Sequence, residues 1–173
     1  MAVILETNRL ILRTWTLDDA DAAFMLWGDP EVMRFVGSST PHQNLNETHR
    51  WLQWAIAYQE EYGFCRWALV EKATGKIIGS CGFLSLDDGS EIDLGYYLAP
   101  PFWGQGYGTE IAEACLRYGF EKLMLREIVA TVDHRHSASQ RVLEKIGFIF
   151  QGRRPSRDTD EKIYLAVNPE GSK

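Results

Sequence analysis

Cysteine is scarce in this chain, and the few cysteines lie far apart. Cys65, Cys81 and Cys115 form no CxxC pair among the 173 residues. An odd and scattered set of this kind excludes a disulfide framework and a cysteine-based zinc site. Each of the three falls in an apolar stretch, which predicts buried, reduced thiols.

Long hydrophobic runs and an excess of positive charge are also missing. No segment approaches the roughly 20 apolar residues of a membrane-spanning helix, and the N-terminus lacks a signal-peptide pattern. The net charge is −6, whereas nucleic-acid-binding domains are typically basic. We therefore expect a cytoplasmic protein whose partners include neither a membrane nor a nucleic acid.

The nucleotide and metal motifs that a sequence can display are incomplete here. No glycine-rich loop ends in Gly-Lys-Ser/Thr, as a Walker A motif does. Counted from Gly104, the sixth residue is Thr109, where a dinucleotide-binding fingerprint has glycine. His134 and His136 lie two apart in one loop, which is a poor ligand set for zinc. No metal is expected.

The composition that remains is that of an ordinary globular protein, with 45% hydrophobic and 24% charged residues. A chain of this length is expected to form a single domain over residues 1–173, with its core at about residues 7–167.

Periodicity and turn residues predict an α/β fold. Strands are expected at residues 9–14, 64–71, 76–86, 91–98, 127–132, 148–151 and 162–167. Thr74-Gly75 and Asp88-Gly89 mark tight turns, so the second, third and fourth of these strands form an antiparallel meander. The helix predicted after strand 91–98 makes that strand parallel to the next one. The sum is a mixed, largely antiparallel sheet with helices on both faces.

Helix starts are marked by capping residues. Thr16 and Asp19 have the spacing of a capping box, and the helix after it is expected to bury Ala23 and Phe24. Asn46 is the predicted cap of the following helix, which runs to Tyr62.

A glycine-rich loop suggests where a ligand binds. Gly104, Gly106 and Gly108 follow a strand and open directly onto a helix. The first backbone N–H groups of a helix have no partner within it and can hold phosphate. The loop alone leaves the ligand open.

Five segments, in order, resemble one superfamily. They are TNRLILR (7–13), GDPEVMRFV (28–36), WALVEKATGKIIGSCGF (67–83), WGQGYGTE (103–110) and SASQRVLEKIGF (137–148). This series is similar to the GNAT superfamily of acyl-CoA-dependent N-acetyltransferases, and within it to the RimJ/RimL-like branch of ribosomal-protein N-terminal acetyltransferases. The resemblance implies acetyl-CoA as co-substrate and a sheet whose central parallel strands splay apart.

The resemblance also implies a set of cofactor-binding residues. Backbone N–H groups of the glycine loop would hold the pyrophosphate, and the strand edge opened near Tyr97 and Leu98, at a β-bulge, would pair with the pantetheine arm. The full set is Tyr97, Leu98, Ala99, Gly104, Gln105, Gly106, Tyr107, Gly108, Thr109, His136 and Ser139. Two positions depart from the family pattern: Trp103 stands where Gln or Arg is usual, and His136 where Asn is usual.

Four residues are candidates for catalysis under the same resemblance. Ser139 fits the position of the proton donor to the departing thiolate, with Tyr96 and Tyr97 as rivals. The backbone N–H of Leu98 would stabilise the oxyanion. Asp93, ahead of Glu91, is the preferred general base, and both carboxylates would leave the strand on the same face.

The acceptor amine stays open at this point. A protein α-amine, with a pKa of about 8, is roughly one-tenth neutral at pH 7, whereas a lysine ε-amine is roughly one part in 2,500 neutral. An N-terminal acetyltransferase can therefore manage with a weak base. The alternatives are a small amine such as a polyamine, aminoglycoside or amino acid, and a non-catalytic CoA-binding module. The chain is expected to be a monomer or a homodimer.

Overall fold

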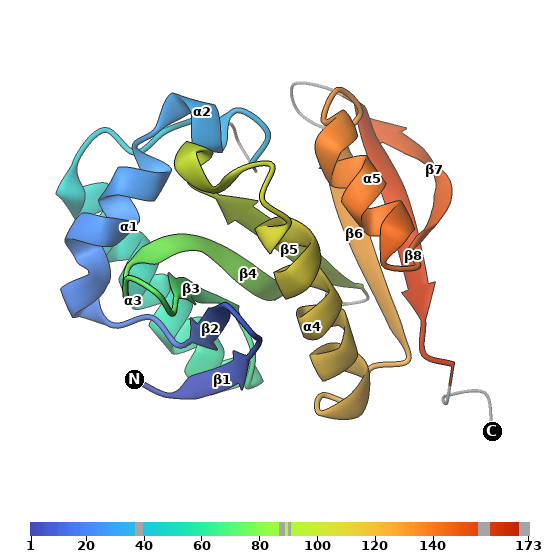
Figure 1. Ribbon diagram of the computed structural model, residues 1–173, viewed down its shortest axis with the longest axis horizontal. Coiled ribbons are helices and arrows are strands. Elements are labelled where there is room, and N and C mark those ends of the chain that lie inside the picture. Colours follow the sequence, from blue (N-terminus) through green and yellow to red (C-terminus); the bar gives the residue numbers. More distant parts are fainter. Residues whose placement is uncertain (37–39, 87–88, 90, 156–159, 170–173) are drawn as a thin grey trace.

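The computed structural model describes residues 1–36, 40–86, 89, 91–155 and 160–169. Its strands form one eight-stranded sheet in the order β1-β2-β3-β4-β5-β6-β8-β7 (Figure 1). The strands are β1 (Val3–Glu6), β2 (Leu10–Arg13), β3 (Arg66–Glu71), β4 (Ile77–Ser85), β5 (Ile92–Leu98), β6 (Glu127–Asp133), β7 (Ile149–Pro155) and β8 (Asp160–Val167). Adjacent strands are antiparallel except β5 and β6, which are parallel. The predicted mixed α/β sheet is confirmed.

Helices cover both faces of this sheet. They are α1 (Ala20–Trp27), α2 (Pro30–Met33), α3 (Leu45–Tyr62), α4 (Tyr107–Glu121) and α5 (Ser137–Lys145), with short 3₁₀ turns η1 (Leu17–Asp19) and η2 (Pro100–Phe102). Figure 1 shows α4 in front of the sheet and α3 behind it. Two neighbouring tyrosines of β5 display the two faces, because the side chain of Tyr97 contacts Trp27 of α1 while that of Tyr96 contacts Ser139 of α5.

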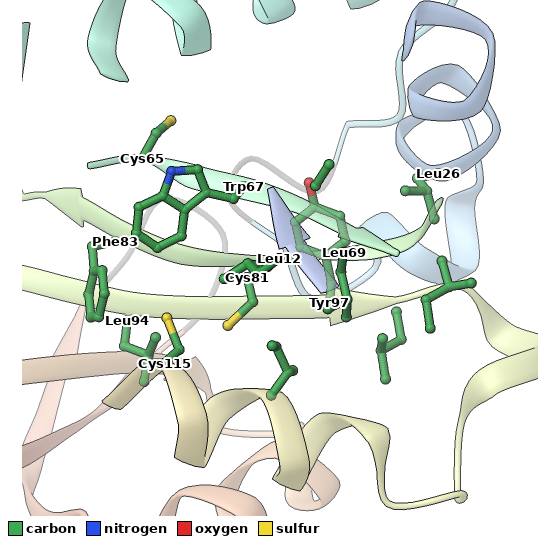
Figure 2. Packing of buried hydrophobic residues seen from close by; sticks show 14 of the residues in the cluster. Leu12, Leu26, Cys65, Trp67, Leu69, Cys81, Phe83, Leu94, Tyr97 and Cys115 are labelled. Atoms are coloured by element: carbon green, nitrogen blue, oxygen red, sulfur yellow. The ribbon is translucent and has the colours of Figure 1, made fainter. Parts of the chain in front are cut away.

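The core lies between the sheet and its helices. Trp67, Tyr164 and Phe83 are among the largest fully buried side chains. The predicted buried thiols are confirmed: Cys81 of β4 and Cys115 of α4 face each other between sheet and helix (Figure 2). Burial also raises the pKa of the Cys65 thiol to about 11, so this thiol stays protonated.

Local signals gave several element boundaries correctly. The capping box of Thr16 and Asp19 is present, although it opens the turn η1 before α1. The Thr74-Gly75 turn is confirmed by the hydrogen bond from the Gly75 N–H to the Glu71 carbonyl, 2.8 Å long. Asp88, in the second predicted turn, lies outside the described residues.

Other boundaries differ from the prediction. Asn44, not Asn46, caps α3, because its side-chain oxygen accepts from the N–H of Glu47. Phe24 is only partly buried, and Leu26 takes the core position instead. Strand β1 was not predicted, and β7 extends to Pro155 because it pairs along its length with β8.

Candidate active site

The glycine loop leaves a row of backbone amides without protein partners. Gly104 and Gly106 adopt the left-handed conformation, with φ of 72° and 80°, which turns the chain into α4. The first intrahelical bond runs from the Glu110 N–H to the Gly106 carbonyl, 3.0 Å. In the part of the chain that the structure describes, no N–H of residues 104–109 donates to another protein group. These amides form a cradle for an anion at a helix N-terminus.

The N-terminal segment supports this cradle from behind. Arg9 donates from Nη1 to the Gln105 carbonyl (3.0 Å) and pairs with Glu110 (2.6 Å). Its guanidinium lies 4.1 Å from the ring centre of Tyr107, whose hydroxyl donates to Glu71 at 2.7 Å. Sequence reasoning missed Arg9, Glu71 and Glu110. All three lie in segments that carry the family resemblance, which was the signal for them.

Beside the cradle, a cavity of about 680 Å³ runs along the outer side of α4. It is lined by Gly106 and Thr109 at the helix start, by the carboxylates of Glu6, Glu110 and Glu113, and by the cations Arg117 and Lys145. Because its lining carries charges of both signs, the cavity by itself does not select an anionic ligand, and the case for anion binding rests on the cradle.

The two parallel strands part next to this loop. The recorded pairing of β5 with β6 consists of Asp93 opposite Val129. The register of β5 with β4 is continuous from Ile92 to Leu98, so the strands part without the expected β-bulge in β5, and that expectation is wrong. The parting comes from the loss of pairing with β6.

Backbone direction decides which amides face the opening. The Ala99 N–H donates to the Ile78 carbonyl beside β4, 2.8 Å. Along an antiparallel strand, successive backbone groups point to opposite edges, so the N–H groups of Leu98 and Tyr96 point toward β6. Of the predicted residues Tyr97, Leu98 and Ala99, only Leu98 turns its N–H to the opening. Tyr96 was missed in this backbone role.

Trp103 explains one departure from the family pattern. Its indole N–H donates to the Leu98 carbonyl at 2.7 Å. The side chain thus holds the end of β5 against the start of the loop.

A hydroxyl pair lies on the α4 side of the opening. The Tyr96 and Ser139 hydroxyl oxygens are 3.2 Å apart, and burial raises the pKa of Tyr96 to about 12. Two of the three candidate donors predicted from sequence are therefore brought together, whereas the hydroxyl of Tyr97 contacts Trp27 on the other face of the sheet. An anion cradle, an opened strand edge and this pair suit an acyl thioester of a nucleotide.

Comparison with known proteins agrees with this geometry. A family model described as an acetyltransferase (GNAT) domain matches residues 9–149. The chain belongs to the GNAT acetyltransferase family. It is 36% identical over 177 residues to the Bacillus subtilis protein named uncharacterized N-acetyltransferase YoaA, covering 98% of this chain and 99% of YoaA.

Solved structures share the fold of this GNAT enzyme. An acetyltransferase from Agrobacterium tumefaciens is 27% identical, with a TM-score of 0.78 over 94% of this chain and 92% of that chain. RimL, described as a ribosomal L7/L12 α-N-protein acetyltransferase in complex with coenzyme A, has a TM-score of 0.84 at 16% identity, covering 96% and 98%. Acetyl-CoA is the co-substrate, and the enzyme is an acetyl-CoA-dependent N-acetyltransferase.

His136 of the GNAT enzyme caps α5. Its Nδ1 accepts from the Ser139 N–H at 3.3 Å, and its ring lies 4.4 Å from that of Phe35. An accepting Nδ1 places the proton of the neutral ring on Nε2. Burial lowers the pKa of His136 and so favours this neutral form. The imidazole nitrogen of His136 thus accepts the N-cap hydrogen bond of α5, as the side-chain oxygen of Asn could at the position where the family usually has Asn.

Asp93 is enclosed rather than exposed. Its side chain is 2% exposed and pairs with Arg66 at 2.6 Å. Its other oxygen accepts from the N–H and hydroxyl of Thr131. This placement argues against the predicted base role, because both oxygens are already occupied by donors.

Glu91 lies just before β5, at the end of the strand away from Leu98. Its carboxylate is 3.5 Å from Arg154 of β7 and 43% exposed. Over the seven residues to Leu98, an extended chain spans roughly 23 Å. The predicted pair of carboxylates is therefore not gathered with Ser139 and Leu98.

The described residues contain no cluster of three His, Cys, Asp or Glu side chains able to hold a metal ion. They also contain no helix whose length and apolarity would let it cross a bilayer.

Proposed function

We propose that this GNAT enzyme acetylates the α-amine at the N-terminus of a protein or peptide, by direct attack within a ternary complex. Acetyl transfer itself follows from the family. The choice of an α-amine rests on one observation: each of the two candidate base carboxylates, Asp93 and Glu91, lies beside an arginine.

Among the described residues, neither of the two candidate carboxylates is placed as a free base at the opening. Asp93 is held by Arg66 and Thr131, and Glu91 lies beside Arg154. A lysine side chain is about 2.4 pKa units more basic than an α-amine, which corresponds to roughly 3 kcal/mol of deprotonation free energy at neutral pH. An enzyme that uses neither of these carboxylates as its base is therefore better suited to an amine that is already partly neutral.

The remaining groups suit the other steps of the transfer. The amine nitrogen forms a bond to the thioester carbon, and the carbon–sulfur bond breaks. The N–H of Leu98 is aimed at the opening and would stabilise the negative oxygen that forms in between. Ser139 would give its proton to the departing thiolate and regain one from solvent, while the proton released by the amine would pass to solvent.

A thiol-release assay tests the acceptor. Acetyl-CoA is supplied with peptides that carry a free N-terminus, with the same peptides blocked at the α-amine but containing lysine, and with polyamines, aminoglycosides and free amino acids. We expect the free N-terminal peptides to give the highest kcat/KM. A higher kcat/KM for a small amine or for lysine would refute the α-amine proposal while leaving acetyl transfer intact.

A further inference from the structure

Where β5 and β6 separate, the side chain of Asp93 accepts a hydrogen bond that a backbone carbonyl would accept in a continuous ladder. Their recorded parallel pairing holds Asp93 opposite Val129. Continued in register, Thr131 would face Gly95 on the next row. Instead, the N–H of Thr131 donates 2.9 Å to Oδ1 of Asp93, and its hydroxyl donates to the same oxygen at 3.1 Å. The Asp93 carboxylate thus ends the ladder by replacing a main-chain acceptor.

The second oxygen of Asp93 is tied to a strand further across the sheet. Nη2 of Arg66, on β3, donates to Oδ2 at 2.6 Å. The Arg66 side chain has to cross β4 to reach β5. Its path is clear because the register places Gly82 beside Arg66 and Gly95 beside Gly82.

Gly95 is needed for this crossing. A Cβ at Gly95 would lie 2.5 Å from the guanidinium carbon of Arg66, closer than any real packing contact. The guanidinium therefore lies directly on the backbone of β5. Arg66, Asp93 and Thr131 together form a polar brace, which we call the strand brace, from β3 through β5 to β6.

The strand brace lies at the inner end of the cofactor opening. The N–H groups that face the opening belong to Tyr96 and Leu98, three and five residues beyond Asp93, or roughly 10 and 17 Å along an extended strand. The two strands pair at Asp93 itself, and in the described residues no pair joins them between there and Leu98, where the pantetheine arm would lie. Because Asp93 is buried and satisfied by three donors, loss of one donor leaves a charge without its full set of partners.

We propose that Asp93 is a positioning residue which, through Arg66 and Thr131, sets the width of the opening between β5 and β6 and thereby the affinity for acetyl-CoA. In this role it does not accept the proton of the amine. The inference rests on acetyl-CoA use and is independent of which amine is acetylated.

Three variants separate this role from that of a base. Asp93→Asn keeps the shape but turns an amide N–H₂ toward either Arg66 or Thr131. Thr131→Val removes the hydroxyl donor and keeps the N–H. Gly95→Ala displaces the guanidinium without changing Asp93. As a matched control, Asp19→Asn disrupts another buried aspartate–arginine pair, with Arg13 of β2, a strand separated from β5 by β3 and β4.

The measurements are the Kd for CoA by calorimetry, the KM for acetyl-CoA, kcat at saturation and its pH profile. We expect Asp93→Asn and Gly95→Ala to raise Kd and KM about tenfold, and Thr131→Val about threefold, on the scale of one lost charge-assisted or neutral hydrogen bond. The kcat at saturation and the midpoint of its pH profile should change little. Asp19→Asn should lower the melting temperature and leave Kd unchanged.

Two results would overturn the proposal. If Asp93→Asn kept Kd and KM but lost kcat together with the pH profile, Asp93 would be the base. If Thr131→Val and Gly95→Ala left Kd for CoA at the wild-type value, the brace would contribute to stability alone. Thr131→Val makes the smallest change, so it decides the matter even if Asp93→Asn fails to fold.

Discussion

The hydroxyl of Tyr96 lies 3.2 Å from the hydroxyl of Ser139, although the two residues are 43 positions apart in the chain. Ser139 is at the start of α5, where its N–H is fixed by His136. The tyrosine therefore meets a serine whose backbone is already held. Tyr96 and Ser139, two alternative candidates for the proton donor, are therefore hydrogen-bonded to each other.

Replacing Ser139 by alanine should slow thiol release more than it weakens cofactor binding. Loss of a general acid typically costs about 100-fold or more in rate. We expect kcat to fall by about that factor and the Kd for CoA to change less than about threefold. A variant that turned over at the wild-type rate would show that Ser139 is not the acid.

Replacing Tyr96 by phenylalanine should have a smaller effect in the same direction. The change removes one neutral hydrogen bond, worth about 1 kcal/mol, so kcat is expected to fall about fivefold. The double variant with Ser139→Ala should be no slower than Ser139→Ala alone, because the tyrosine acts through the serine. Additive losses in this cycle would make Tyr96 an independent donor.

Replacing Gly106 by alanine should weaken CoA binding through the cradle. Its φ of 80° is strained for any residue with a Cβ, at a cost of about 1–2 kcal/mol. Gly63, the C-cap of α3, has a φ of 78° and open space around it, so Gly63→Ala is the matched control for strain. We expect similar losses in the free energy of unfolding, but a Kd for CoA raised about tenfold only in Gly106→Ala. If Gly106→Ala and Gly63→Ala had the same Kd for CoA, the glycine loop would not be the phosphate-binding site.

The capping role of His136 predicts a pH dependence of stability. Its pKa is lowered by burial, below the value of 6.5 that it has in the unfolded chain. At a pH between the folded and the unfolded pKa, the unfolded chain binds more protons at this histidine than the folded protein does. The contribution of His136 to the free energy of unfolding therefore falls as the pH drops below 6.5. Above that pH the contribution is constant. His42, whose pKa is also lowered by burial, contributes with the same sign.

Replacing His136 by asparagine isolates this contribution. Asn keeps a side-chain acceptor for the α5 cap and does not titrate. Urea unfolding at pH 7.5 and at pH 5.5 should show a smaller loss of stability in His136→Asn than in the wild type. An identical loss in both proteins would assign the pH dependence to other groups.

Features that depend on local chemistry could be predicted from the amino-acid sequence. Alternating apolar residues and the turn at Thr74-Gly75 predicted the antiparallel meander, and the glycines at 104 and 106 predicted a sharp entry into α4 with free amides. These features follow from the backbone preferences of neighbouring residues. They need no knowledge of the rest of the fold.

Contacts between side chains that are distant in the sequence could be identified only in the folded structure. Asp93 reads as a strand carboxylate until Arg66, 27 residues earlier, and Thr131, 38 residues later, enclose it. Arg9 reaches the Gln105 carbonyl across 96 positions. The lack of a β-bulge likewise depends on pairing among three strands. Such contacts are fixed by the packing of the whole sheet, because no local preference specifies which distant donor fills a buried acceptor.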